Sequence, residues 1–192
     1  MQEEIKQIWD TQAIPVELEK LIQFQEEESG FEEYAQGFGV QADDKDGLRF
    51  GWCDNTDFLD RLYPFAQANG SGSFYAIWDD GSGKALSDMP IVVFGDEGGE
   101  YVVAKNILQL LQILTLDTEI FVLPYDEPSF IKDEGDDYCE STDSQRYIEW
   151  LDKEFGLKAV DENDVNGIIS AAQAQYQKQF EDWMSQHIDM DE

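Results

Sequence analysis

The chain has 192 residues, of which 42% are hydrophobic and 13% aromatic, a composition that excludes intrinsic disorder and allows one domain with a core of its own. Its 43 acidic residues against 12 basic ones give a formal net charge of −31, which disfavours binding to nucleic acid or to an anionic membrane.

The first predicted element is a helix near the N-terminus. Pro15 suits a first helical turn, and glycine at Ser29-Gly30 can take the left-handed conformation that ends a helix. Between them, Val16, Leu18, Leu21 and Ile22 follow at near-helical spacing. Residues 43–47 are typical of a turn, and we expect a short strand over residues 48–52.

The middle of the chain predicts a β-rich region. Asp54 or Asn55 is placed to cap a short helix that carries Phe58, Leu59, Leu62 and Phe65. Three strands follow, over residues 73–78, 91–94 and 101–104. Gly95, Gly98 and Gly99 supply the positive-φ residues that a hairpin between the last two strands needs.

The last part of the chain predicts helices. Asn106 is placed to cap a helix through residue 116 that is apolar nearly all round and should be buried on several sides. Residues 126–143 hold eight carboxylates and one lysine, so we expect an irregular, exposed connection. Helices over residues 144–155 and about 162–187 follow, and the second has an apolar stripe. Packing on its own domain is the expected role of that stripe, and a partner-binding face is the alternative.

These elements predict one α+β domain over residues 1–192. Its core spans about residues 14–125, the acidic connection spans residues 126–143, and C-terminal helices span residues 144–188.

The compartment can be inferred from three features. The N-terminal residues lack the basic start and apolar stretch of a signal peptide, and the densest apolar stretch, residues 107–116, is far shorter than the roughly 20 residues of a membrane span. Cys53 and Cys139 lie far apart, without metal-type spacing. We therefore expect a cytoplasmic protein with two reduced thiols and no membrane partner.

The common catalytic and metal-binding motifs are missing. His187 is the only histidine and lies near the C-terminus, where we expect an exposed helix-end residue outside any triad or zinc site. A phosphate loop around Gly83 would need glycine where Trp78 stands, and the calcium-loop alignments on Gly47 and Gly167 fail at required ligands. With 43 acids, a pair of carboxylates carries almost no information about catalysis. We expect no catalytic residue, no cofactor and no metal site.

Three segments occur in order that together resemble the SUKH superfamily. They are FAQANGSGSFYAIW over residues 65–78, MPIVVFGDEGG over residues 89–99 and VVAKNIL over residues 102–108. The resemblance runs from about residue 59 to residue 116, with weaker agreement back to Pro15 and a loose alignment after Asp126. This superfamily contains the yeast cell-wall-assembly regulator and many bacterial immunity proteins. The resemblance implies a curved, mostly antiparallel sheet backed by helices and a binding function without catalytic residues.

The charge and the resemblance together predict a partner. We expect an immunity-type protein that neutralises a cationic toxin, with a nuclease domain as the leading class, because an anionic surface competes for a cationic groove and speeds association. A regulatory interaction scaffold without a toxin partner is the alternative, followed by a carboxylate-based enzyme. The expected contacts are acids on turns and on the acidic connection: Asp79, Asp80, Asp96, Glu97, Asp133, Glu134, Asp136, Asp137 and Glu140.

Overall fold

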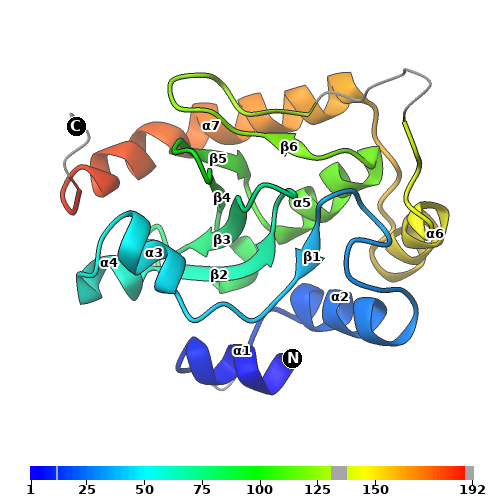
Figure 1. Ribbon diagram of the computed structural model, residues 1–192, viewed down its shortest axis with the longest axis horizontal. Coiled ribbons are helices and arrows are strands. Elements are labelled where there is room, and N and C mark those ends of the chain that lie inside the picture. Colours follow the sequence, from blue (N-terminus) through cyan, green and yellow to red (C-terminus); the bar gives the residue numbers. More distant parts are fainter. Residues whose placement is uncertain (12, 131–137, 189–192) are drawn as a thin grey trace.

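A computed structural model of the protein describes residues 1–11, 13–130 and 138–188. Its central element is an antiparallel sheet of five strands in the order β1-β2-β3-β4-β5, so strands that are neighbours in space also follow one another in the chain (Figure 1). The strands are β1 Gly39–Val40, β2 Leu62–Gln67, β3 Phe74–Trp78, β4 Ile91–Phe94 and β5 Glu100–Ala104, and a second small sheet pairs β6 Ile120–Phe121 with β7 Ser129–Phe130. The expected α+β class with a mostly antiparallel sheet is confirmed.

Helices precede, interrupt and follow the sheet. They are α1 Gln2–Ile8, α2 Val16–Glu27, α3 Asp46–Gly51, α4 Thr56–Leu59, α5 Ile107–Ile113, α6 Ser144–Phe155 and α7 Glu162–Met184. Short 3-10 helices cover Leu86–Asp88 and Leu114–Leu116. The predicted helices that begin after Pro15, after Asn106 and at Ser144 are confirmed, as is the long C-terminal helix that begins at Glu162.

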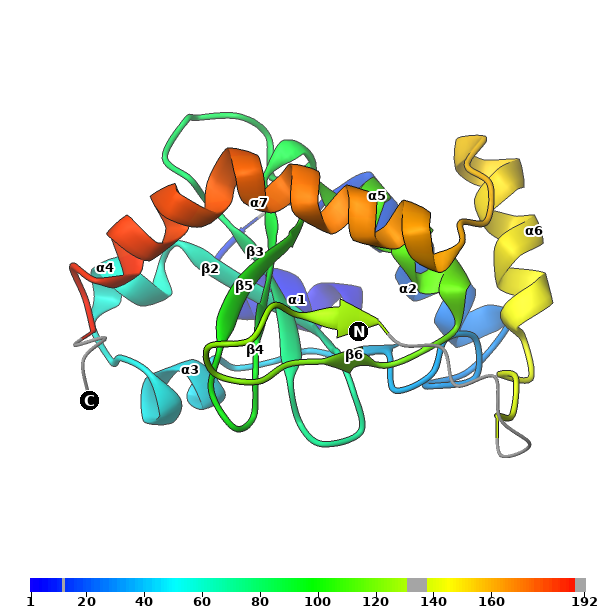
Figure 2. The same cartoon turned by 90° about the horizontal axis from the view of Figure 1, so that it is seen from above.

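The sheet lies between two layers of helices. Successive side chains of a strand point to opposite faces, and in β3 Tyr75 and Ile77 join one hydrophobic cluster while Phe74, Ala76 and Trp78 join another. The first cluster includes residues of α1, α2, α5 and α6, and the second includes residues of α3, α4 and α7. Figures 1 and 2 show α7 along one side of the sheet, with α1 and α2 on the other. Because both faces are covered, every residue of β3 and β4 is buried.

The apolar stripe of α7 packs on its own sheet, as expected. The Phe180 ring meets Trp78 of β3 edge-on, with ring centroids 5.0 Å apart, and stacks against Trp183 at 5.9 Å. Ala172 and Tyr176 belong to the same cluster, on the face that carries Val92 and Val102. The long C-terminal helix therefore completes the core.

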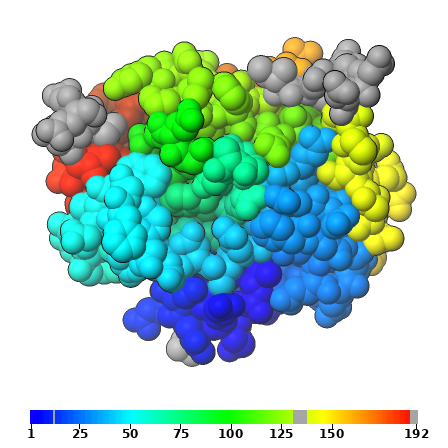
Figure 3. Space-filling model, viewed as in Figure 1, coloured from blue at the N-terminus to red at the C-terminus, as the bar shows by residue number. Residues whose placement is uncertain are grey.

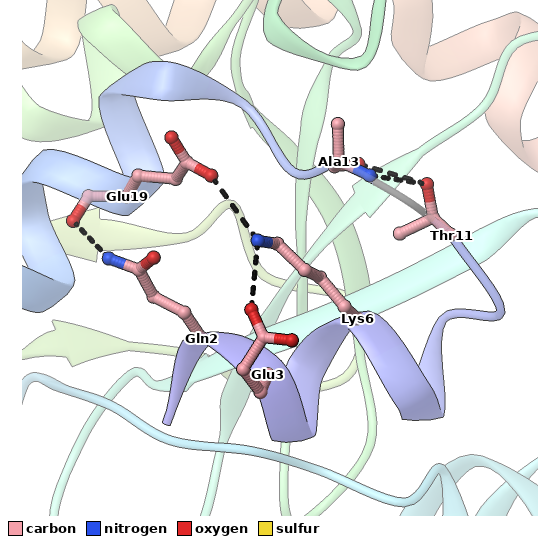
Figure 4. Close-up of polar contacts among 6 residues, drawn as sticks. All are labelled: Gln2, Glu3, Lys6, Thr11, Ala13 and Glu19. Carbon is pink, nitrogen blue, oxygen red and sulfur yellow. Dashed lines mark hydrogen bonds and ion pairs between the residues drawn. The ribbon is translucent and has the colours of Figure 1, made fainter.

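The N-terminal helix α1 is attached to α2 by polar side chains (Figure 4). The Lys6 ammonium lies 3.1 Å from a carboxylate oxygen of Glu3 and 3.7 Å from one of Glu19, and Gln2 donates to the Glu19 carbonyl oxygen at 3.2 Å. The hydrogen bond from Lys6 to Glu3, followed by the charges of Glu3 and Glu19, raises the pKa of the lysine. Ile5 and Trp9 of the same segment are buried, so apolar packing holds α1 from beneath.

The predicted hairpin of β4 and β5 is confirmed. The strands pair antiparallel, with Phe94 opposite Glu100 and Val93 opposite Tyr101. Gly98 and Gly99 both have positive φ angles, near 95° and 93°, as the turn requires. Gly95 serves the turn differently, because a Cβ atom there would lie 2.3 Å from the carbonyl oxygen of Gly98.

The prediction of a strand over residues 48–52 is wrong, because most of this segment belongs to α3. In a strand, Leu48, Phe50 and Trp52 would share one face, whereas Leu48 and Trp52 are i and i+4 in a helix. In the structure Leu48 is buried and Phe50 is 88% exposed. The preceding turn starts the helix. Lys45 has a left-handed backbone conformation, the Asp43 carboxylate accepts from the Lys45 amide, and the Asp44 carboxylate accepts from the Asp46 amide.

The helix expected to carry residues 58–65 ends early. Asn55 caps α4 by accepting from the Asp57 amide at 2.8 Å, but Leu62 and Phe65 belong to β2. Pro64 lies inside this run, where it lacks an amide hydrogen and would break a helix. In the structure, the register between β2 and β3 shifts between Pro64 and Ala66. The Pro64 carbonyl oxygen accepts from Trp9 Nε1 at 3.2 Å.

The acidic connection is only partly irregular. Ser129–Phe130 pairs with Ile120–Phe121, and Phe130 is buried. Asp133, Glu134, Asp136 and Asp137 lie outside the described residues. The expectation of an exposed loop is therefore corrected at residues 129 and 130.

Candidate functional site

An open groove of about 1160 Å³ lies at the end of the sheet where β3 and β5 begin and β4 ends. Segments from across the chain form its walls, and several of them meet on the left half of the face in Figure 3. The residues that line it are Gln41, Asp43, Gly47, Gly51, Trp52, Gly72, Phe74, Gly95, Asp96, Glu97, Gly98, Gly99, Glu100, Tyr101, Pro124, Tyr125, Gln177, Glu181, His187 and Ile188.

The charge of the groove is negative. Among its described lining residues there is no lysine or arginine, while five are carboxylates: Asp43, Asp96, Glu97, Glu100 and Glu181. Carboxylates gathered in a concave surface reinforce one another's potential, because the low-dielectric walls focus the field. The groove therefore favours a cationic occupant.

Asp96 joins two turns at the rim of the groove. Its carboxylate oxygen Oδ1 accepts from the hydroxyls of Ser71 and Ser73, both at 2.8 Å, and its amide donates to Ser73 Oγ at 3.2 Å. The hydrogen bond from Ser73, with a smaller one from Ser71, holds the pKa of Asp96 below its usual range. Asn69 orders the same turn by accepting from the amides of Gly72 and Ser73. Asp96 is thus an anion held in a fixed place.

Glu97 and Glu100 differ in how they are held. A carboxylate oxygen of Glu100 accepts from Trp52 Nε1 at 2.5 Å, which ties β5 to the residue that follows α3. Glu97 is exposed at the tip of the β4–β5 turn and makes no hydrogen bond or ion pair within the part of the chain that the structure describes. Glu97 is therefore available to a ligand.

On one side of the groove, the β4–β5 turn meets Pro124 and Tyr125, and the glycines of that turn allow the close approach. A Cβ atom on Gly95 would lie 2.7 Å from a methyl group of Val122, and one on Gly99 would lie 2.8 Å from the carbonyl oxygen of Leu123. Tyr101 donates its hydroxyl to the same carbonyl oxygen at 2.8 Å. The sequence indicated these glycines as turn residues only, whereas they also let residues 122–125 approach the turn closely.

Aromatic side chains flank the acids. Tyr125 has a left-handed backbone, with φ near 68°, and its side chain is 96% exposed. Trp52 packs against the rings of Phe74 and Phe94 at centroid distances of 5.8 and 4.9 Å. Phe50 is exposed on α3, the helix that also contributes Gly47 and Gly51 to the groove. The groove thus combines fixed carboxylates with accessible aromatic surface.

Asp79 and Asp80, two of the expected contacts, lie at the other end of β3 and serve the fold. Arg61 Nε donates to the Asp79 carbonyl oxygen at 2.7 Å, and Asp79 Oδ1 accepts from the Gly81 amide at 2.8 Å. Asp80 is buried, accepts from the Ser82 amide at 2.8 Å and lies 3.7 Å from the Lys84 ammonium. Burial raises the pKa of Asp80, but the hydrogen bonds from Ser82 and the Lys84 charge outweigh it and hold that pKa low. The structure does not bring this pair together with Asp96 and Glu97.

Glu140 lies in a third place, just before α6. Its carboxylate accepts from the Ser144 hydroxyl at 2.7 Å, in the first turn of that helix. The nearby Asp117 is buried and accepts from the Gln36 and Ser141 amides and from the Tyr138 hydroxyl. Glu140 therefore lies beside a structural polar cluster.

Several groove residues were not predicted as site residues from the sequence. They are Gln41, Trp52, Tyr101, Tyr125, Gln177 and Glu181. Glu100 and Glu181 are two acids among 43, and nothing in their local sequence marks them. Only the fold gives them a common position.

His187 is half-buried, which corrects the expectation of an exposed helix end. Its ring lies 5.8 Å from that of Phe58 and 5.3 Å from that of Trp183. Across the described ranges, no group of three histidine, cysteine, aspartate or glutamate side chains could hold a metal ion.

Two further findings lie outside the groove. In residues 1–11, 13–130 and 138–188, no helix has both the length and the apolar character that crossing a membrane requires. Comparison with protein-family models, with curated proteins and with solved structures gives no match.

Proposed function

We propose that this chain is a non-catalytic protein-binding domain of the immunity type, which neutralises a cationic toxin domain by occupying its basic surface. The observation that carries the proposal is the acidic groove between the β4–β5 turn, α3 and the end of α7, with its five carboxylates. Trp52 and Tyr125 of its lining, together with the nearby exposed Phe50 of α3, form its aromatic rim. The net charge of −31 extends the same field over the whole molecule. The resemblance to the SUKH superfamily supports the same function.

The size of the groove favours a protein partner over a metabolite. Pockets for small molecules typically measure about 300–1,000 Å³ and are mostly apolar. This groove is larger, at about 1160 Å³, and it is open and rich in carboxylates. An exposed loop or chain end of another protein fits it better than a small ligand does.

The sheet edges favour the groove as the binding surface. Addition of a partner strand needs an edge strand with free amides and carbonyls. Here side-chain amides of Gln25 and Gln177 bind the outer edges of β1 and β5, and Trp9 donates to the Pro64 carbonyl oxygen of β2. A partner strand would have to displace these bonds.

A nuclease domain is the toxin class that fits best. Nucleases hold polyanions in cationic grooves, so an anionic protein surface competes directly with the substrate and is attracted over long range. Cys53 and Cys139 are free thiols, as a reducing compartment would keep them, so we place the encounter in the cytoplasm.

The test has two stages. Proteins captured with the tagged chain at low salt are identified, and each candidate partner is expressed alone and together with the chain. The proposal expects a partner that arrests growth alone and is harmless with the wild-type chain. Protection should fail with Glu97→Lys and persist with Glu149→Lys, a matched charge reversal on the exposed face of α6.

Two other outcomes would contradict the proposal. A partner that binds through the groove without being toxic alone would identify a regulatory scaffold. A toxin neutralised equally well by the Glu97→Lys variant would place its interface outside the groove.

A further inference from the structure

We propose that the groove recognises arginine in particular: a protruding segment of the partner inserts a guanidinium that pairs with Glu97 and stacks on the Tyr125 ring. This inference rests on the proposed function and names the chemistry of the partner at the same site. It follows from three observations: the availability of Glu97, the exposure of the aromatic rim, and the way the protein holds one of its own arginines.

Two aromatic side chains at the groove, Tyr125 and Phe50, are largely exposed. Tyr125 lines the groove and is 96% exposed, and Phe50, on the helix that contributes Gly47 and Gly51 to the groove, is 88% exposed. Tyrosine and tryptophan supply much of the binding energy at protein interfaces, so an exposed tyrosine in a concave surface is a candidate contact. A cation held over such a ring is attracted by its negative face.

The pairing of rings with carboxylates selects arginine over lysine. A guanidinium is planar, binds a carboxylate through two parallel hydrogen bonds and stacks on an aromatic face at the same time. An ammonium is a compact, strongly hydrated charge that gains less from the ring. The aromatic rim adds to this difference, because a guanidinium can pair with a carboxylate and stack on a ring together.

The protein holds one of its own arginines between aromatic rings and a backbone oxygen acceptor. The Arg61 guanidinium lies 5.7 Å from the Trp78 ring centroid and 5.1 Å from that of Trp183, while its N–H groups donate to the Asp79 carbonyl oxygen. That arginine lies at the other end of β3 and does not line the groove. It shows that a guanidinium in this protein can lie over aromatic rings and bond an oxygen acceptor at the same time.

The groove presents its charges in fixed positions. Asp96 is held by Ser71 and Ser73, Glu100 by Trp52, and Glu181 accepts from Gln177 at 3.0 Å. Groups that are already ordered cost less to bind than flexible ones. Glu97 makes no hydrogen bond or ion pair among the described residues, so both of its carboxylate oxygens can face a ligand.

The experiment uses blocked peptides in which arginine, lysine or citrulline alternates with glycine, titrated into the full chain by calorimetry at low salt. Citrulline keeps the planar shape of arginine without its charge. We expect the arginine peptide to bind about threefold or more tighter than the lysine peptide, the size of one exposed cation–ring contact, and the citrulline peptide not to bind measurably.

Two pairs of variants locate the site. Tyr125→Leu removes the ring and keeps a side chain on the same left-handed backbone; its control is Phe121→Leu, an exposed ring of β6 that does not line the groove. Glu97→Gln removes the free carboxylate, and its control is Glu149→Gln on α6. We expect Tyr125→Leu to reduce the preference for arginine, Glu97→Gln to weaken both cationic peptides, and both controls to bind like the wild type.

The outcomes separate this inference from the proposed function. Equal binding of arginine and lysine, with no effect of Tyr125→Leu, would overturn arginine recognition; a remaining effect of Glu97→Gln would keep the groove as a cationic site. Absence of binding by every peptide, or binding indifferent to both groove variants, would also overturn the inference. The growth assay with the captured partner still decides the proposed function on its own.

Discussion

Gln25 of α2 and Gln177 of α7 perform the same task at opposite edges of the sheet. The Gln25 amide donates to the Val40 carbonyl oxygen at 2.9 Å and accepts from the Val40 amide at 2.8 Å. The Gln177 amide donates to the Glu100 carbonyl oxygen at 3.2 Å and accepts from the Val102 amide at 2.7 Å. Each side chain thus replaces a neighbouring strand, so the helices that cover the two faces also close the edges of β1 and β5.

Gln25→Leu should destabilise the fold. Gln25 is buried, and its loss would leave the Val40 backbone and the Tyr34 hydroxyl, which donates to Gln25 at 2.9 Å, without their partners. Because each buried group left unpaired costs about 1–3 kcal/mol, we expect a loss of at least about 2 kcal/mol in the free energy of unfolding. Urea denaturation measures it, with Gln23→Leu on the exposed face of α2 as the control. A similar loss in both variants would contradict a specific role of the Gln25 amide.

Removing the Tyr75 hydroxyl should have the opposite effect from removing that of Tyr147. Both side chains are fully buried, but Tyr147 donates to the Leu111 carbonyl oxygen at 2.7 Å, whereas the Tyr75 hydroxyl has no hydrogen-bond partner among the described residues. Tyr75→Phe removes an unsatisfied polar group, so the stability should stay equal or rise. Tyr147→Phe should cost about 1 kcal/mol. Thermal unfolding of the two variants side by side gives the comparison, and a larger loss for Tyr75→Phe would refute it.

Leu111→Ala tests the helix that precedes β6. Leu111 and Leu110 of α5 are fully buried in the same cluster as Ile91 and Val103 of the sheet. Truncation of a buried leucine removes its transfer free energy and leaves a cavity, so we expect a loss of about 2–5 kcal/mol. An unchanged denaturation midpoint would mean that α5 contributes little to the core.

The stability that Asp96 contributes should depend on pH. Ser73 and then Ser71 lower the pKa of Asp96 from its ordinary value of 3.8, so near that pH the folded chain binds fewer protons than the unfolded chain. The carboxylate therefore stabilises the fold above about pH 4, and the contribution is lost as the pH falls through the lower folded pKa.

The measurement compares wild type with Asp96→Asn. The difference between their free energies of unfolding should be largest near neutral pH and shrink as the solution is acidified below about pH 4. Because both proteins share the other carboxylates, the comparison isolates Asp96 from the change in overall charge. A difference that stays constant across this range would show that the two serine hydroxyls do not favour the charged form.

Association with the captured partner should depend on salt and on the acidic connection. The Debye length falls from about 30 Å at 0.01 M to about 8 Å at 0.15 M, so electrostatic steering should fade and the on-rate should drop. Neutralising Asp133, Glu134, Asp136 and Asp137 together to Asn or Gln should lower the on-rate more than it raises the off-rate, since distributed charges act mainly on the encounter. Stopped-flow mixing measures both. An on-rate that ignores salt and the quadruple change would assign the acidity to solubility.

Local signals were enough to predict much of the chain. Asn106 caps α5 by accepting from the Gln109 amide, and the glycines after Phe94 allow the hairpin of β4 and β5. Such features act within a few residues, so they can be read without knowing the fold. The errors fell where local signals conflict. Residues 48–52 alternate like a strand, but the core they meet favours a helix with Leu48 inside and Phe50 in water.

The sequence alone determined the α+β class, the middle hairpin, the long helices and the strongly negative charge, because these depend on composition and on neighbours along the chain. It did not determine which acids act together. Asp96 and Glu97 share a groove with Glu100 and Glu181, whereas Asp80 is buried in an ion pair with Lys84 at the other end of β3. A carboxylate's role depends on the groups that surround it in space, and with 43 acids in the sequence only the tertiary structure decides those neighbours.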